Sequence, residues 1–244
     1  METIVLKLGG SVLFEPSGEL NSDIVSKWLS VLVDLTQHAK IIVVVGGGRP
    51  ARKYISWGRN LHLNEYECDE LGIQVSRLNA YLLLAALKHR VSNTQIRIYG
   101  SIPKSPIEVY EIKDDYDVIF VGGFIPGQST VGVAAEVAEL SGARVLAIGT
   151  DVNGIFDKDP KIYSDAKKFD LIMVDELINA FLRGSEFAGT YTLFDIQSLK
   201  LIKRSKLSVL VFNANNPEIA KNVILAFLRG NIEHVVKYAS MIVV

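Results

Sequence analysis

The chain has 244 residues, of which 49% are hydrophobic and 22% charged, and its 26 basic side chains nearly balance 27 acidic ones. This length suits one large domain or two closely joined lobes with a sizeable core. Intrinsic disorder needs low hydrophobicity and high net charge, and a formal net charge of -1 with this apolar content excludes it. The same charge balance argues against a nucleic-acid polymer as partner, because such binders are usually basic overall.

Membrane and secretory signals are also missing from the sequence. No apolar run approaches the ~18 residues of a membrane-spanning helix, so we expect no membrane partner. The first residues carry neither a basic leader nor a small-residue cleavage site, and the single Cys68 cannot form an internal disulfide. We therefore expect a cytoplasmic protein. The four histidines show no metal-ligand spacing, so we predict no metal site built by protein side chains.

Short apolar runs alternate with helical patterns along the chain. The runs are continuously apolar, which is typical of strands buried on both faces, as in a parallel sheet. The alternation predicts a layered α/β fold. In chain order, we expect strand 4–8, helix 22–38, strand 41–45, helices 51–57 and 71–88, strands 96–99 and 118–121, helix 131–140, strand 145–148, helices 174–182 and 193–204, strand 209–212 and helix 217–228.

Turn residues mark several element ends. Asn153-Gly154 stands between two apolar residues and predicts a hairpin directly after strand 145–148. Gly230 is expected to end the last helix. A second group of elements begins near residues 142–144, where we place a boundary if there is one.

Glycine-rich loops follow four of the expected strands. Ligands of open α/β sheets bind outside the carboxyl ends of the strands, where glycines let backbone N–H groups approach an anion. One such loop is explained by a tight turn, whereas four together indicate a trough for several phosphates. The loops contain Lys7-Leu8-Gly9-Gly10-Ser11, Gly46-Gly47-Gly48-Arg49, the segment 122–130 and Thr150-Asp151-Val152-Asn153-Gly154.

Two common nucleotide-binding motifs are excluded. The third loop nearly spells a Walker A motif, but Gln128 stands where the phosphate-binding lysine is required. In the second loop Arg49 and Pro50 follow the three glycines, so the dinucleotide-binding fingerprint is absent.

Individual side chains near these loops allow two interpretations each. Lys7 either snorkels to water from its strand end or reaches a transferred phosphoryl group. Arg52 is either a solvated side chain or a bidentate phosphate ligand. Asp69 either caps the helix expected from Leu71 or accepts a hydrogen bond from a ligand hydroxyl such as that of a ribose. Phe156 either packs or forms a wall for a nucleobase.

With these loops in this order, the chain resembles the amino acid kinase superfamily over essentially its whole length, and within it the archaeal uridylate (UMP) kinases. The narrower resemblance rests mainly on residues 51–55, 72–80 and 126–130. The segments that carry the resemblance are 6–13, 45–55, 71–80, 122–130, 150–160 and 188–191.

This resemblance implies a three-layer α/β/α sandwich around a mainly parallel central sheet, as one domain over residues 1–244. An acceptor lobe would comprise residues 1–142 and a donor lobe residues 143–244. The implied reaction is phosphoryl transfer from ATP to UMP, giving ADP and UDP in pyrimidine nucleotide biosynthesis. Mg²⁺ would be the cofactor, and the implied assembly is a homohexamer built as a trimer of dimers.

The resemblance also assigns roles to residues of this sequence. Lys7 and Arg52 would be catalytic, with Lys7 stabilising the charge that moves between the two phosphates. The implied UMP contacts are Gly47, Gly48, Arg52, Asp69, Phe124, Gly127, Gln128, Ser129 and Thr130. The implied ATP contacts are Gly9, Gly10, Ser11, Gly48, Thr150, Asp151, Phe156 and Asp159.

Three departures from the superfamily pattern leave alternatives open. Val131 stands where much of the superfamily has an Asp, the usual Asn-Val-Asp-Gly reads Asp151-Val152-Asn153-Gly154, and the C-terminal tail lacks the usual ending. One alternative is another phosphotransferase of the superfamily, such as an isopentenyl phosphate kinase. Its catalytic His would stand near the second glycine loop, and His62 is too far along the chain. The other is an inactive nucleotide-binding regulator, motivated by Val131.

Overall fold

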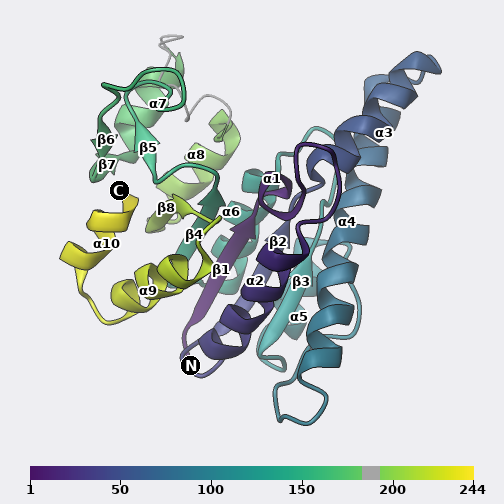
Figure 1. The fold of residues 1–244 in the computed structure, drawn as a ribbon, viewed down its shortest axis with the longest axis horizontal. Coiled ribbons are helices and arrows are strands. Elements are labelled where there is room, and N and C mark those ends of the chain that lie inside the picture. Colours follow the sequence, from purple (N-terminus) through teal and green to yellow (C-terminus); the bar gives the residue numbers. More distant parts are fainter. Residues whose placement is uncertain (183–192) are drawn as a thin grey trace.

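The computed structural model describes residues 1–182 and 193–244 and shows a twisted sheet with helices on both faces (Figure 1). Within these residues, a seven-stranded sheet has the order β3-β2-β1-β4-β8-β9-β7. Neighbouring strands are parallel except that β9 runs antiparallel to β8. The strands are β1 (Thr3–Leu8), β2 (Lys40–Val45), β3 (Val118–Val121), β4 (Val145–Thr150), β7 (Leu171–Met173), β8 (Val209–Asn213) and β9 (Ala239–Val243).

The two faces of the sheet bury separate hydrophobic clusters. In β1, Ile4 and Leu6 face one cluster and Val5 faces the other, as expected from the two-residue period of a strand. The first face is covered by α2 (Ser22–Leu35), α4 (Glu65–Arg90) and α9 (Pro217–Leu228), and the second by α5 (Pro106–Ile112), α6 (Thr130–Ser141), α7 (Val174–Leu182) and α8 (Ile196–Arg204). The prediction of a three-layer α/β/α sandwich with a mainly parallel sheet is therefore confirmed.

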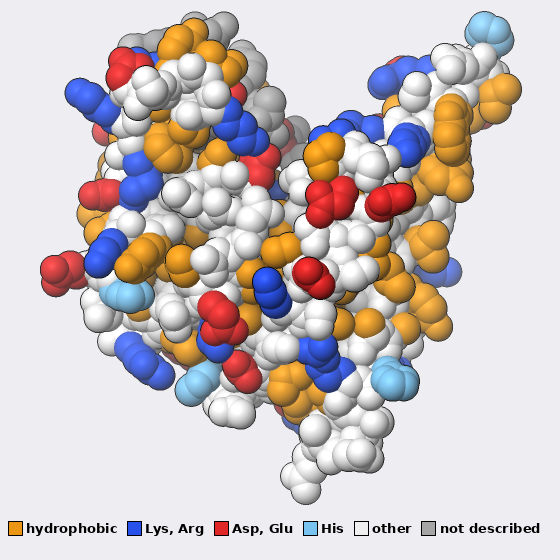
Figure 2. All heavy atoms as spheres, in the orientation of Figure 1, with side chains coloured by type: hydrophobic (Ala, Val, Ile, Leu, Met, Phe, Trp, Pro, Cys, Tyr) orange, Lys and Arg blue, Asp and Glu red, His pale blue; other side chains and the backbone are white. Residues whose placement is uncertain are grey.

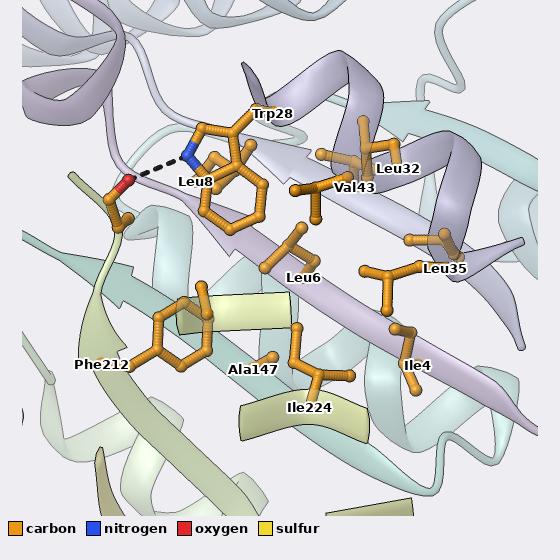
Figure 3. Packing of buried hydrophobic residues seen from close by; sticks show 14 of the residues in the cluster. Ile4, Leu6, Leu8, Trp28, Leu32, Leu35, Val43, Ala147, Phe212 and Ile224 are labelled. Carbon is orange, nitrogen blue, oxygen red and sulfur yellow. Dashed lines mark hydrogen bonds between the residues drawn. The ribbon is translucent and has the colours of Figure 1, made fainter. Parts of the chain in front are cut away.

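Packing in the first cluster holds α2 and α9 over the middle of the sheet. Figure 3 shows Trp28 of α2 close to Leu8 and Leu6 of β1, with Ile224 of α9 near Phe212. The indole N–H of Trp28 donates a hydrogen bond of 2.9 Å to the carbonyl of Ala214, which satisfies a buried polar group. The core is thus continuous beneath the strand ends that carry the loops.

Strand register brings the carboxyl ends of the parallel strands to one edge of the sheet. Leu8 of β1 lies opposite Val45 of β2 and Gly149 of β4. Val44 lies opposite Val121 of β3. The four loops predicted to bind anions therefore start from the same edge. The short helices α1 (Gly10–Leu13) and α3 (Gly48–Asn60) begin within the first two loops.

Two predictions about strands are wrong. Residues 96–99 form no strand, since only Ile98 bridges to Val118, at the edge of the sheet. The predicted hairpin at Asn153-Gly154 does not form, because β5 (Ile155–Phe156) pairs instead with β6 (Lys168–Phe169). Gly154 has φ +137°, and a Cβ there would lie 2.4 Å from Ser240 Oγ, so this glycine serves close packing against β9.

Helix α4 begins six residues earlier than predicted. Asn64 caps it by accepting a hydrogen bond from the Glu67 N–H, and the Glu67 carboxylate accepts from the Asn64 N–H, each at 2.9 Å. Asp69 consequently lies inside the helix, and its predicted alternative role as an N-cap is wrong.

The other helix ends and the C-terminus complete the fold. Gly230, with φ +75°, follows the last turn of α9 as predicted. The C-terminal tail forms α10 (Ile232–Tyr238) and β9, which no sequence pattern had indicated. Among the helices of residues 1–182 and 193–244, none combines the length and hydropathy of a membrane span. Residues 188–191, which contributed to the resemblance, lie outside the described residues.

Candidate active site

Two cavities adjoin at the carboxyl edge of the sheet. One, of about 550 Å³, lies over the ends of β1 and β4, and the other, of about 440 Å³, lies between α4 and the loop 122–130. Both are lined by Gly47, Gly48, Arg52, Ser129 and Thr130. The cavities over the strand ends, called the β4 cavity and the α4 cavity below, therefore meet at the second glycine loop.

The first and second glycine loops touch through bare backbone. A Cβ on Gly10 would lie 2.1 Å from Gly48 Cα, and a Cβ on Gly48 would lie 2.7 Å from Gly10 Cα. Gly48 also has φ +63°, a conformation that side chains disfavour. Only glycine at both positions allows this approach, which brings two sets of backbone N–H groups to the junction of the cavities.

Lys7 is a buried cation at the floor of the β4 cavity. It is 9% exposed and lies in β1 between Val44 and Ile148. Burial lowers the pKa of Lys7 to about 8, and the negative charge of Asp151 opposes that shift. A Cβ on Gly9 would lie 3.1 Å from the Lys7 Nζ, so the ammonium sits beside the first glycine loop. This burial favours the anion-facing interpretation over snorkelling to bulk water.

The negative charge that acts on Lys7 comes from the end of β4. Asp151 lines the β4 cavity and pairs with Lys161, its Oδ2 lying 2.5 Å from the Lys161 Nζ. Val131, at the position where much of the superfamily has an Asp, is 3% exposed and lines the same cavity. Lys161 was not predicted as a site residue, although Asp159, two residues before it, was.

The third loop is held by hydrogen bonds from three directions. The Gly127 N–H donates to Asp69 Oδ2 at 2.8 Å, which ties the loop to α4. The Gln128 Nε2 donates to Glu136 Oε2 at 2.8 Å. The Ser129 hydroxyl donates to the Asp195 carboxylate at the start of α8 and accepts from the Gly132 N–H at the start of α6. The loop that lines one side of the α4 cavity is therefore fixed in position by hydrogen bonds to α4, α6 and α8.

Three polar side chains of α4, missed by sequence reasoning, position the second and third loops; Ser76 and Asn79 are buried and Arg77 is half-buried. Ser76 Oγ accepts from the Gly123 N–H at 2.8 Å, and Arg77 Nε donates to the Gly123 carbonyl at 2.9 Å. Asn79 Nδ2 donates to the carbonyls of Gly46 and Gly47 at 3.0 and 3.1 Å. Their signal in the sequence is that they interrupt the largely apolar stretch 71–87 of α4, where a buried polar group needs a partner.

The structure brings together nearly all the side chains predicted from the resemblance. Lys7 and all eight predicted ATP contacts line the β4 cavity, and Arg52, the other predicted catalytic residue, lines both cavities. The predicted UMP contacts line the α4 cavity with one exception. Phe124 is 6% exposed, packs in the core of the second face and lines neither cavity, so its contact with UMP stays a prediction. Sequence reasoning missed Ile55, Gly72 and Ile73, which line the α4 cavity.

Known proteins are similar to this chain in sequence and in fold. Residues 2–213 match the amino acid kinase family. The chain is 41% identical to a uridylate kinase of Sulfolobus acidocaldarius, covering 93% of this chain and 95% of that protein. It is 37% identical to a uridylate kinase of Methanocaldococcus jannaschii, covering 94% and 98%.

Solved structures agree with this match. The crystal structure of uridylate kinase from Archaeoglobus fulgidus is similar with a TM-score of 0.78 and 32% identity, covering 99% of this chain and 100% of that one. UMP kinase from Ureaplasma parvum has a TM-score of 0.77 at 19% identity over 100% and 99% of the two chains, a likeness of fold.

Proposed function

The chain belongs to the amino acid kinase family, and we propose that it transfers the γ-phosphoryl group of ATP to UMP, giving ADP and UDP in pyrimidine nucleotide biosynthesis. One observation carries the proposal: two cavities of nucleotide size share Gly47, Gly48, Arg52 and Thr130 as their common wall. Direct transfer between two nucleotides needs two such sites that meet where the phosphoryl group crosses. The uridylate kinases with 41% and 37% identity support UMP as the acceptor.

In this assignment UMP occupies the α4 cavity. The Asp69 carboxylate faces that cavity and accepts hydrogen bonds from the ribose hydroxyls while keeping its bond to the Gly127 N–H. Arg52 is exposed and lines both cavities, so its guanidinium can bind the UMP phosphate bidentately. Gln128, Ser129 and Thr130 close the remaining side of the acceptor nucleotide.

ATP occupies the β4 cavity, where Phe156 supplies an apolar wall for the adenine. The bare backbone of Gly9 and Gly10 lies against the phosphates. Thr150, Asp151 and Asp159 line the nucleoside side of the cavity together with Phe156.

Lys7 neutralises charge during the transfer. Its ammonium lines the β4 cavity beside the first glycine loop, where negative charge is redistributed among the ATP phosphates, the transferred group and the UMP phosphate during transfer. Bound phosphates raise the pKa of Lys7 from its value of about 8 in the free protein, so the cation is retained during the reaction. The chemistry is in-line displacement with no covalent intermediate on the protein.

Mg²⁺ fits this site as a companion of the ATP phosphates. In residues 1–182 and 193–244, no group of three or more His, Cys, Asp or Glu side chains is arranged to hold a metal ion. Mg²⁺ in phosphotransferases is bound by substrate phosphates with one or two carboxylates, and Asp151 and Asp159 line the β4 cavity. When bound, the ion neutralises phosphate charge.

The acceptor preference tests the proposal. ADP release is measured with UMP, CMP, glutamate, carbamate and isopentenyl phosphate as acceptors, at fixed ATP and Mg²⁺. We expect UMP to give the highest kcat/KM, and a higher value for any other acceptor would overturn the assignment. His62, which follows the end of α3, lines neither cavity, which disfavours an isopentenyl phosphate kinase.

The buried Val131 in the β4 cavity keeps one rival function open, that of an inactive nucleotide-binding regulator. Calorimetry with UMP and a non-hydrolysable ATP analogue distinguishes the two. Binding of both ligands with Mg²⁺ but without ADP release would identify a regulator. Retention of Lys7 at the cavity floor favours the enzyme.

Membership of the amino acid kinase family also supports proposals about localisation, partners, lobes and assembly. We infer a cytoplasmic enzyme with no nucleic-acid or membrane partner, with residues 1–142 as acceptor lobe and 143–244 as donor lobe. We also infer from the family a homohexamer built as a trimer of dimers, and an apolar edge along α3 and α4 (Figure 2) supports self-association. Tyr54 and Trp57 of α3 and Leu78 and Tyr81 of α4 are large hydrophobic residues, each about half exposed or more.

A further inference from the structure

Asn79 occupies an unusual place for an amide side chain. It lies in the middle of the 26-residue helix α4 and is only 7% exposed. Asparagine has a low helix propensity, and an amide buried among apolar side chains costs free energy unless it is hydrogen-bonded. The Asn79 Nδ2 meets this requirement by donating to two consecutive carbonyls, those of Gly46 and Gly47. Asn79 lines neither cavity and lies beneath the second glycine loop.

These two hydrogen bonds set the direction of the neighbouring amides. In a trans peptide the C=O of one residue and the N–H of the next point in opposite directions, and no peptide bond of residues 1–182 and 193–244 is cis. Holding the Gly46 and Gly47 carbonyls towards Asn79 therefore turns the N–H groups of Gly47 and Gly48 away from it. Both glycines line both cavities, so the two N–H groups are directed to the side where the cavities meet.

The amides of the loop differ in whether they are already used. The Gly46 N–H donates to the Leu8 carbonyl at 3.0 Å, which ties the start of the loop to β1. Within the part of the chain that the structure describes, the Gly47 and Gly48 N–H groups have no acceptor. A pair of adjacent, unpaired and co-directed N–H groups at a helix start is suited to a phosphate oxygen.

We propose that Asn79 is a positioning residue for phosphoryl transfer, which aims the Gly47 and Gly48 N–H groups at phosphate oxygens by holding the two carbonyls behind them. The inference rests on the proposed function for the identity of those phosphates. Without the Asn79 donor, the Gly46 carbonyl loses the partner that orients it, and the Gly47 carbonyl keeps only the long bond of 3.3 Å from the Ala51 N–H. The loop is then held by the bond from the Gly46 N–H to Leu8 and by its contact with Gly10.

Two substitutions of similar side-chain size test this role kinetically. Asn79→Leu removes the donor and leaves an apolar group, whereas Asn79→Asp places a carboxylate against two carbonyls. Each should lower kcat/KM for UMP by on the order of 10- to 100-fold, the effect of weakening hydrogen bonds to a charged group. As pH falls, the Asn79→Asp variant should recover relative to wild type, because a protonated carboxyl group is again a donor. Wild-type kcat/KM in a folded Asn79→Leu protein would overturn the proposal.

A spectroscopic measurement separates positioning from general stability. In ¹⁵N-labelled wild-type protein, UMP should shift the Gly47 and Gly48 amide resonances, and in Asn79→Leu those shifts should be lost. Leu87→Ala serves as the control. Leu87 is a buried core residue of α4, two turns further along than Asn79, so its truncation destabilises the helix without removing a contact with the loop. It should retain both shifts. Equal loss of the shifts in Leu87→Ala and Asn79→Leu would show a merely structural role and overturn the proposal.

These experiments distinguish a failure of the proposed kinase function from a failure of the positioning role of Asn79. Absence of kinase activity in wild type would defeat the proposed function. Shifts of the Gly47 and Gly48 amides with UMP or inorganic phosphate, dependent on Asn79, would still support the orientation of the loop. Unchanged shifts in Asn79→Leu would defeat the role of Asn79 in an active enzyme.

Discussion

The buried charge of Lys7 lowers the stability of the folded protein, although the proposed reaction needs it. Its ammonium is buried at the end of β1, and the lowered pKa records that folding disfavours the charged form. A side chain of similar length without charge should therefore suit the fold better and the reaction worse. The same conflict between stability and activity is common at sites preorganised for charged ligands.

Lys7→Met tests this conflict. We expect the free energy of unfolding at pH 7 to rise by up to about 3 kcal/mol, the order of magnitude implied by a pKa lowered from 10.5 to about 8. We expect kcat to fall by at least about 100-fold, because electrostatic stabilisation of the transferred group is lost. Urea denaturation and the ADP-release assay measure the two effects. A variant that is less stable and fully active would contradict the role given to Lys7.

The pKa of Lys7 also predicts a pH dependence. In the free protein the ammonium is lost as pH rises through about 8, whereas in the unfolded chain it is retained to about 10.5. The kcat/KM for UMP should therefore fall above pH 8. Between pH 8 and 10.5 the unfolded state binds the extra proton, so the contribution of this group to stability rises with pH. Comparison of wild type with Lys7→Met isolates this contribution, and identical pH profiles of stability would refute it.

At the scale of elements, the glycine loops were predictable and their supports were not. Parallel strands place their carboxyl ends at one edge, so the residues after β1, β2, β3 and β4 could be grouped from sequence alone. The direction of a side chain within a loop depends on tertiary packing, which is why the burial of Phe124 in the core was not predicted. Asn79 was missed because its partners are backbone carbonyls 32 and 33 residues away.

The close approach of the first two glycine loops predicts that Gly10 cannot be replaced by a larger residue without loss of stability and activity. Gly10→Ala places a Cβ within 2.1 Å of Gly48 Cα, so one loop must move. We expect a loss of about 1–3 kcal/mol in stability and at least about 10-fold in kcat/KM. Gly100→Ala is the matched control, because its Cβ would meet only the end of the Lys88 side chain, at 3.2 Å. Thermal unfolding and kinetics that rank the two variants equally would contradict the contact.

At the scale of the whole molecule, the central sheet joins the two predicted lobes, since β1 pairs directly with β4. The alternation of apolar runs and helical patterns was sufficient to predict the layers. The C-terminal strand β9 could not be predicted, because its place between β8 and β7 depends on a long-range antiparallel pairing. The exposed apolar edge on α3 and α4 likewise becomes visible only when the helices are packed together.

The exposed apolar edge on α3 and α4 predicts that the chain associates with further copies of itself. Light scattering coupled to gel filtration should show wild type as a homo-oligomer, and the double variant Leu78→Asp with Tyr81→Asp should have a lower mass, because charges disfavour burial of this surface. Ile107→Asp, at an exposed apolar position of α5, should leave the mass unchanged. A monomeric wild type would contradict the prediction.

The most direct test of the whole account is a crystal structure with UMP and a non-hydrolysable ATP analogue bound together. We predict the uridine in the α4 cavity with its ribose at Asp69, and the adenine in the β4 cavity beside Phe156. The UMP phosphate and the end of the triphosphate chain of the ATP analogue should meet between the Gly47–Gly48 amides and Lys7. Binding of UMP beside Phe156, or of either nucleotide outside both cavities, would contradict the assignment.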